Sequence, residues 1–256
     1  MTRLPGLFVV GTDTGVGKTR VASAIARTWT LAGRRVGVLK PVASGATARE
    51  GKLVSDDAAR LIHAIGGDVD PARVAPILFE EPLAPPVAAR RLGQPLTMAS
   101  LIDSVAACLA WWESRAEVVV VEGVGGLLCP IAEGATVADL AIALDLPLLV
   151  VAHRSLGTLN HTLLTVEAAQ SRSLRIAGVV LNGARPTVDP IAEATNAEEL
   201  ARRLGGVAIL ADWPHFDGPD VPIVAPEAGG WYDLAKPSRS ARSATDARPG
   251  PAGPAA

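Results

Sequence analysis

The stretch GTDTGVGKT, residues 11–19, follows directly on the short apolar run Leu7–Val10. Glycines after a strand let the backbone approach phosphate oxygens, and the start of a following helix presents unpaired N–H groups to them. Lys18 would reach the β- and γ-phosphates, and the Thr19 hydroxyl suits Mg²⁺. Five residues separate the first and last glycines where the common motif has four, so this is a variant phosphate-binding loop for a mononucleotide. Its predicted nucleotide-binding residues are Asp13, Thr14, Gly15, Val16, Gly17, Lys18 and Thr19.

Short apolar runs alternate with longer helical patterns along the chain. The predicted strands are Leu7–Val10, Val36–Leu39, Val118–Val121, Leu148–Val151, Ile176–Leu181 and Val207–Leu210. The predicted helices cover residues 18–32, 56–65, 98–115, 136–144, 158–171 and 195–204. Continuous apolar strands are typical of parallel sheets buried on both faces. The alternation therefore predicts an α/β fold of the P-loop NTPase type, a doubly wound and mostly parallel sheet with helices on both faces.

Polar residues stand where several of these apolar runs end. Lys40, Glu122 and Asn182 each follow a predicted strand, so they should meet at the carboxyl edge of the sheet, where open α/β sheets bind ligands. Asp56 and Asp57 open a helix, either as capping acids or as metal ligands. An aspartate and a glutamate beside Thr19 would supply the oxygen ligands that Mg²⁺ prefers. The two lysines, Lys18 and Lys40, would stabilise charge on a transferring phosphoryl group.

Two segments depart from this alternation. Residues 67–97 contain six prolines and are predicted to be a loop that covers part of the site, not a central strand or a long helix. Residues 236–256 are rich in Pro, Ala, Ser and Arg, which predicts a disordered tail. The expected organisation is one domain over residues 1–235 followed by that tail.

Composition narrows the class of protein. The chain has 256 residues and a formal net charge of −2, which gives no electrostatic drive toward nucleic acid or acidic membranes. Cys108 and Cys129 have no metal-binding spacing and are expected to be buried thiols, although they could pair. The first residues do not resemble a signal peptide, and no apolar stretch has the length of a membrane span. A cytoplasmic protein is expected.

Five motifs together resemble one family. GTDTGVGKT, LKPVASG, VVVEGVGGLLCPI, LGTLNHTLLTVEAA and GVVLNG are similar, in order and separation, to motifs of ATP-dependent dethiobiotin synthetases, over about residues 5–215. The resemblance implies synthesis of the ureido ring of dethiobiotin from 7,8-diaminononanoate, CO₂ and ATP, with ADP and phosphate as the other products. It also implies Mg²⁺ as cofactor and a homodimer whose substrate lies near the subunit interface.

The resemblance also suggests roles for individual residues. It implies that Lys40 and Lys18 are catalytic and that Asn182 reads adenine. Thr19, Glu122 and an aspartate of SDDAARL match the metal-binding positions; the family pattern favours Asp57, with Asp56 as the alternative. The residues matching substrate-binding positions are Thr14, Ser44 and Asn160.

The sequence differs from the family pattern at two places. Gly15 stands where some members have an acidic side chain, and residues 153–155 read His-Arg-Ser where many read Arg-Pro-Gly.

Partition and cell-division ATPases, which use ATP as a dimerisation switch, carry an early loop lysine where this chain has Thr12, Asp13 and Thr14. Relatives that activate a carboxylate in cobalamin synthesis usually carry a glutaminase domain, for which this chain has no room. The synthetase is the favoured hypothesis, with the ATPase switch as the alternative.

Overall fold

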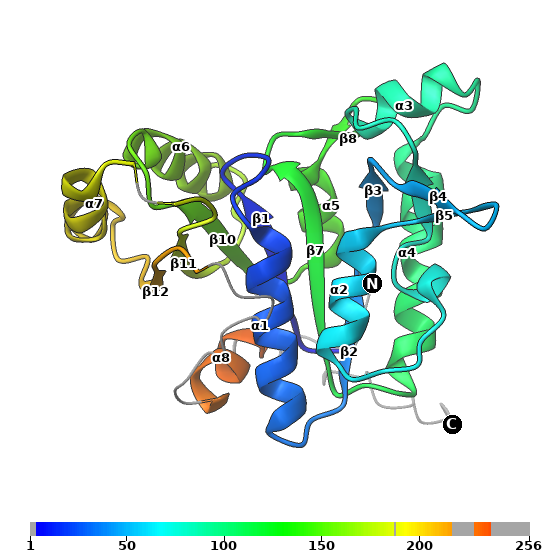
Figure 1. Cartoon of the computed structure of the whole chain (residues 1–256), viewed down its shortest axis with the longest axis horizontal. Helices are drawn as coiled ribbons and strands as arrows, with labels where there is room; N and C mark the ends of the chain where they lie inside the picture. The colour runs from blue at the N-terminus through cyan, green and yellow to red at the C-terminus, as the bar shows by residue number, and fades with distance from the viewer. Residues whose placement is uncertain (1–3, 187, 217–227, 237–256) are drawn as a thin grey trace, which may run out of the picture.

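A six-stranded parallel sheet forms the centre of the molecule in this computed structural model, which describes residues 4–186, 188–216 and 228–236 (Figure 1). Across the sheet the strand order is β12-β11-β10-β1-β7-β2. The bounds are β1 Gly6–Gly11, β2 Val36–Leu39, β7 Val118–Gly126, β10 Leu148–His153, β11 Ile176–Asn182 and β12 Ile209–Trp213. The predicted fold class and strands are confirmed, although β12 begins at Ile209 rather than Val207.

Helices bury both faces of this sheet. The bounds are α1 Lys18–Leu31, α2 Asp56–Ala64, α4 Met98–Glu113, α5 Val137–Leu144, α6 Thr158–Gln170, α7 Pro190–Arg203 and α8 Ala228–Ala235. Helices α1, α2 and α8 lie in front of the sheet in Figure 1. Strand side chains alternate between the faces, so Leu7 and Val9 of β1 belong to the core on the α1 side, and Phe8 and Val10 to the core on the α5 side. Burial on both sides explains the continuous apolar runs.

The direction of winding reverses at β1. The chain first builds β2 and β7 on one side of β1, and then crosses over to build β10, β11 and β12 on the other. Connections leaving the carboxyl ends of β1 and its neighbours therefore diverge and leave a crevice between them. This topology places the loop after β1, the end of β7 and the end of β2 around one opening.

The proline-rich segment is more structured than predicted. It contains the short elements η1 Pro71–Arg73, β6 Ile77–Phe79 and α3 Pro85–Arg91. Strand β6 pairs in parallel with β3, Val42–Ser44, outside the central sheet. Helix α3 begins with two prolines, whose missing N–H groups cost nothing in a first turn. The expectation that this segment avoids central strands and long helices is confirmed, and residues 82–85 line the cavity described below. The prediction that the segment is a loop is wrong where these three elements occur.

Helix starts follow local capping. Helix α7 begins at Pro190, earlier than predicted, because the Asp189 side chain caps it by accepting from the backbone of Ala192. Three small pairs of strands complete the described structure: β3 with β6, β4 Thr47–Arg49 with β5 Lys52–Val54, and β8 Pro130–Ala132 with β9 Ala135–Thr136. Within the described ranges, no helix has both the length and the apolar character needed to cross a membrane. The predicted tail lies, apart from Lys236, outside the described residues.

Candidate active site

The phosphate-binding loop connects β1 to α1 and has a backbone that requires glycine. Gly15 and Gly17 have positive φ angles of 77° and 90°. A Cβ atom on Gly17 would lie 2.1 Å from the amide nitrogen of Asn182, so this position also has no room for a side chain. Lys18 is buried at the start of α1, and its ammonium group donates to the Asp13 carbonyl over 3.0 Å. Burial, with the charge of Lys40, lowers the pKa of Lys18 to about 8.

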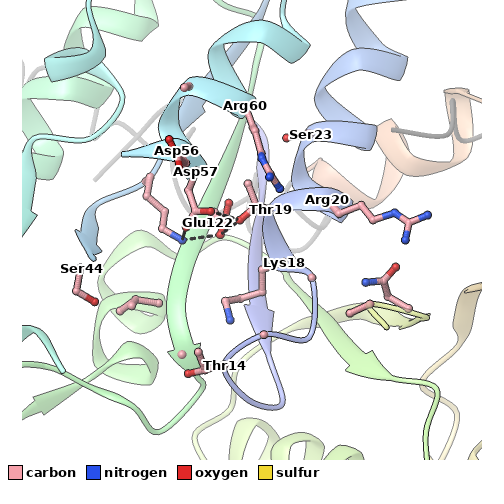
Figure 2. A pocket seen from close by; sticks show the side chains of 18 of the residues that line it. Thr14, Lys18, Thr19, Arg20, Ser23, Ser44, Asp56, Asp57, Arg60 and Glu122 are labelled. Atoms are coloured by element: carbon pink, nitrogen blue, oxygen red, sulfur yellow. Dashed lines mark hydrogen bonds and ion pairs between the residues drawn. The ribbon is translucent and has the colours of Figure 1, made fainter. Parts of the chain in front are cut away.

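A buried lysine, Lys40, follows β2 and joins two carboxylates, Asp57 in the first turn of α2 and Glu122 of β7. Strand β7 continues past its predicted end at Val121, so Glu122 lies within the strand instead of after it. The ammonium nitrogen of Lys40 lies 2.5 Å from Glu122 Oε1 and 2.8 Å from Asp57 Oδ2, and it donates to the Gly123 carbonyl over 3.2 Å. Lys40 is 3% exposed and Glu122 is 1% exposed. We call Lys40, Asp57 and Glu122 the lysine–carboxylate cluster. Figure 2 shows its interactions beside Thr19.

The pKa values in the lysine–carboxylate cluster follow from burial and pairing. Burial alone would lower the pKa of Lys40, but the charges of Glu122 and Asp57 outweigh it and raise that pKa. Burial opposes ionisation of Asp57 as well, yet Lys40 and the Thr19 hydroxyl lower its pKa. Burial raises the pKa of Glu122 despite Lys40. Lys40 therefore stays charged at neutral pH.

The oxygen atoms around Thr19 fit a magnesium site. The Thr19 hydroxyl lies 2.8 Å from Asp57 Oδ1 and 2.8 Å from Glu122 Oε1. Because a hydroxyl has one proton, it can donate to only one of these two oxygens at a time. Glu122 Oε2 is buried without a hydrogen-bond partner among the described residues. No cluster of three or more His, Cys, Asp or Glu side chains that could hold a metal occurs within the described ranges. Two carboxylates and a hydroxyl are nevertheless oxygen ligands of the kind that Mg²⁺ prefers, and Thr19, Asp57 and Glu122 would hold it.

The structure separates the two aspartates at the start of α2. Asp57 joins the lysine–carboxylate cluster, whereas exposed Asp56 pairs with Arg49 of β4 over 2.9 Å. Ser55 caps the helix by accepting from the backbone of Ala58, which fixes where the first turn begins. Of the two candidates, Asp57 is the one that contacts Thr19.

Asn182, at the end of β11, contacts the phosphate-binding loop. Its side-chain nitrogen donates to the Val16 carbonyl over 2.8 Å, and its Oδ1 atom is buried without a partner in the part of the chain that the structure describes. The next carbonyl, of Gly183, lies 3.0 Å from the His215 ring. The sequence did not indicate that Asn182 holds the loop.

One cavity of about 1160 Å³ contains most of the predicted site residues. Those that line it are Thr14, Gly15, Gly17, Lys18, Thr19, Lys40, Ser44, Asp57, Glu122 and Asn182. Asp13, Val16 and Asn160 are absent from the described lining; Asp13 and Val16 take part through the carbonyl contacts above, and Asn160 is exposed in the first turn of α6. Other lining residues lie outside the motifs and were not predicted; they include Arg20, Ser23, Arg27, Arg60, Cys129 and Phe216.

The chain is similar to known proteins over most of its length. The protein-family model of an AAA domain matches residues 5–218. The ATP-dependent dethiobiotin synthetase BioD of Anaeromyxobacter dehalogenans (strain 2CP-C) is 49% identical over 77% of this chain and 84% of its own length. The chain belongs to the dethiobiotin synthetase family. The BioD of Bacillus cereus (strain G9842) is 39% identical over 84% of this chain and 85% of its own. Among solved structures, chloroplast FtsY from Physcomitrella patens matches with 18% identity and a TM-score of 0.48, over 93% of this chain and 66% of that one.

Arg154 lies in the segment His-Arg-Ser, residues 153–155, and the structure shows what this arginine contacts. Arg154 follows β10 and forms paired hydrogen bonds with Asp212 of β12. It also donates to Glu193 of α7 over 3.1 Å, while its own carbonyl accepts from Asn196 over 2.6 Å. We call Arg154, Glu193, Asn196 and Asp212 the Arg154 network. It ties the loop before α6 to α7 and to β12.

Proposed function

We propose that this chain is an ATP-dependent ligase that forms the ureido ring of dethiobiotin from 7,8-diaminononanoate and CO₂, releasing ADP and phosphate. The observation that carries the proposal is the convergence of Lys18, Lys40 and the Thr19–Asp57–Glu122 oxygens on one cavity at the phosphate-binding loop. Its family membership supports the same reaction.

The reaction needs positioning and charge stabilisation more than covalent help from the protein. One substrate amine adds to CO₂ and loses a proton, which gives a carbamate. A carbamate oxygen then attacks the γ-phosphorus, and the bond between that phosphorus and ADP breaks. The second amine attacks the carbamate carbon, and phosphate leaves with the bonding electron pair as the ring closes.

Each lysine has a proposed role in these steps. Lys18 holds the β- and γ-phosphates from the start of α1, and Lys40 lies across the cavity beside the carboxylates. Both ammonium groups act where water is excluded, which strengthens their effect on the charge of the transferring phosphoryl group. Thr19, Asp57 and Glu122 would hold Mg²⁺, which would neutralise phosphate charge when bound.

The remaining lining residues fit the two organic ligands. One N–H of the Asn182 amide donates to the Val16 carbonyl, and the buried Oδ1 acceptor has no partner among the described residues. A lone acceptor suits the exocyclic amino group of adenine, which supports adenine recognition by Asn182. Thr14 and Ser44 line the same cavity and are proposed to contact the diaminononanoate.

We also propose a homodimer in which Asn160 serves the neighbouring subunit. Asn160 is exposed and lies outside the cavity lining of its own chain, as expected for a residue that completes a partner's site. The substrate carboxylate lies roughly 8–10 Å from its diamine, by extended-chain reach, so a second anchor is needed. A verified mixed dimer of Lys40→Ala and Asn160→Ala subunits should keep one intact site. Activity no higher than that of either parent would reject this arrangement.

The domain boundary and the location stay predictions. We propose one domain over residues 1–235, and we expect deletion of residues 237–256 to leave the melting temperature nearly unchanged, because this segment has no large apolar side chain to bury. A cytoplasmic location rests on the sequence alone.

A direct assay tests the function. The protein is incubated with 7,8-diaminononanoate, bicarbonate and MgATP, and dethiobiotin is sought by mass spectrometry. A ligase should release phosphate only when diaminononanoate is present. An ATPase switch would hydrolyse ATP without it and make no dethiobiotin, and that result would favour the alternative.

A further inference from the structure

The cavity continues beyond the lysine–carboxylate cluster into a groove between α1 and α2. On α1 its wall follows the sequence at intervals of four: Thr19, then Ser23, then Arg27. Residues four apart lie on one face of a helix, so these side chains form a stripe that begins at the proposed magnesium site. With a rise of about 1.5 Å per residue, the stripe runs roughly 12 Å from Thr19 to Arg27.

A second stripe on α2 faces the first. It begins at Asp57 and continues through Arg60 and His63, which also line the cavity. Figure 2 shows Arg60 pointing from α2 toward α1, near Ser23 and Thr19. The two stripes start at the oxygens that contact each other, Thr19 and Asp57, and lead away from the γ-phosphate position. We call the space between them, lined by Ser23, Arg27, Arg60 and His63, the basic groove.

The charges of the basic groove are not balanced by the protein. The acids that share the cavity have partners, because Asp57 and Glu122 contact Lys40, and Asp56 contacts Arg49. By contrast, in the part of the chain that the structure describes, the side chains of the two groove arginines and of His63 have neither an ion pair nor a hydrogen bond.

A polar group in the α1 wall adds to this imbalance. Ser23 is 1% exposed, and its hydroxyl has no hydrogen-bond partner among the described residues. Buried polar groups are normally paired, so an orphaned one in a cavity wall points to a ligand. Two guanidinium groups and a hydroxyl donor together suit an anion with several oxygens, for which phosphate is the matching chemistry.

We propose that the basic groove is a second phosphate site, which takes up the inorganic phosphate that leaves the γ position. This inference rests on the proposed function, because only a reaction that splits ATP at this place supplies the phosphate there. ADP, which stays on the phosphate-binding loop, obstructs one side of the γ position. The groove opens on the other side, and Arg60 is the first unpaired cation along it.

A binding experiment isolates this site from the nucleotide site. The β,γ-imido analogue of ATP, with Mg²⁺, first fills the phosphate-binding loop and the γ position, and inorganic phosphate is then titrated calorimetrically. The wild-type protein should bind one phosphate per chain. The double variant Arg27→Gln/Arg60→Gln should bind it at least about tenfold more weakly, since charge-assisted hydrogen bonds are lost. The charge-matched control Arg202→Gln/Arg203→Gln, on exposed α7, should bind as the wild type does.

A kinetic experiment tests whether the bound phosphate is the product. In a single turnover, dethiobiotin is measured by chemical quench and free phosphate by a fluorescent sensor. In the wild type, free phosphate should lag behind dethiobiotin, because the groove holds the product before releasing it. In the Arg27→Gln/Arg60→Gln variant the two should appear together. No saturable phosphate binding to the filled wild type, or equal binding by that variant, would overturn the site. No lag in the wild type, or the same lag in the variant, would overturn its assignment to the product. If no dethiobiotin forms at all, the proposed function fails, while the titration still decides whether the groove holds phosphate.

Discussion

Two partly buried groups of charge in this molecule have the same kinds of charge and different surroundings. The lysine–carboxylate cluster sets one lysine against Asp57 and Glu122, and the Arg154 network sets one arginine against Glu193 and Asp212. Each consists of one cation and two carboxylates that come from separate elements. A count of charges would not distinguish them.

Hydrogen bonding and access separate the two groups. The lysine–carboxylate cluster lines the cavity and leaves Glu122 Oε2 without a partner among the described residues. In the Arg154 network, Nε, Nη1 and Nη2 of the arginine all donate to carboxylates, and Arg154 is outside the described cavity lining. An incompletely satisfied group at a cavity is poised for a ligand, whereas a saturated one holds elements together.

The largest expected effect is the loss of Lys40. Lys40→Met should lower kcat by about 10³-fold, because a cation that stabilises transferred charge in a water-excluded site is removed. Steady-state formation of dethiobiotin measures it. The matched variant Arg154→Met removes the other cation and should keep kcat within about threefold, since Arg154 touches no part of the cavity. Equal losses in two folded variants would erase the functional difference between the groups.

The second prediction concerns the free energy of unfolding, for which the Arg154 network matters. Arg154→Met leaves two carboxylates without their cation and should lower the free energy of unfolding by about 2–4 kcal/mol, below the fully buried range because Asp212 is partly exposed. Urea denaturation measures the change. The control Arg202→Met removes exposed ion pairs on α7 and should cost less than about 1 kcal/mol. If the two variants are equally stable, the Arg154 network contributes no more than a surface pair.

The same contrast explains what the sequence could predict. Lys40, Glu122 and Asn182 were found because each follows an apolar run, and parallel strands bring their ends to one edge. In the Arg154 network, the partners Glu193 and Asp212 lie 39 and 58 residues after Arg154 in the sequence. No motif or regular spacing predicts that these residues meet. The choice between Asp56 and Asp57 was open for another reason. Neighbouring helical residues point about 100° apart, so the choice depends on where Ser55 starts α2.

The third prediction tests the orphaned oxygen of Glu122. Glu122→Gln keeps the shape of the side chain and removes its charge, so the Mg²⁺ concentration that half-saturates the nucleotide-bound protein should rise about tenfold or more. Titration calorimetry with the β,γ-imido analogue of ATP measures this without turnover. Asp56→Asn removes a neighbouring carboxylate that pairs with Arg49 and should leave Mg²⁺ affinity unchanged. Weaker Mg²⁺ binding in Asp56→Asn, with unchanged binding in Glu122→Gln, would show that Asp56 and not Glu122 is the metal ligand.

The smallest expected effect is a dependence on pH at Lys18, which lines the cavity together with the lysine–carboxylate cluster. Arg154 keeps its charge throughout, because the hydrogen bond with Asp212 raises its pKa. Lys18 instead has a folded-state pKa of about 8, below its ordinary value of 10.5. Between these two values the unfolded chain binds a proton that the folded chain lacks. Stability of the ligand-free protein should therefore rise with pH in this window, by at most about 1.4 kcal/mol per unit from this group.

Nucleotide affinity should change in the opposite direction in the same window. Phosphates require the charged form of Lys18, so above pH 8 MgATP analogue binding should weaken by at most about tenfold per pH unit and take up a proton from solution. Lys18→Met serves as the control for both measurements, because the difference between the two proteins isolates one ammonium group from every other titration. Proton uptake is read from calorimetry in two buffers of different ionisation heat. Identical pH slopes in wild type and variant would show that Lys18 stays charged in the free protein, and that the lysine–carboxylate cluster compensates for its burial.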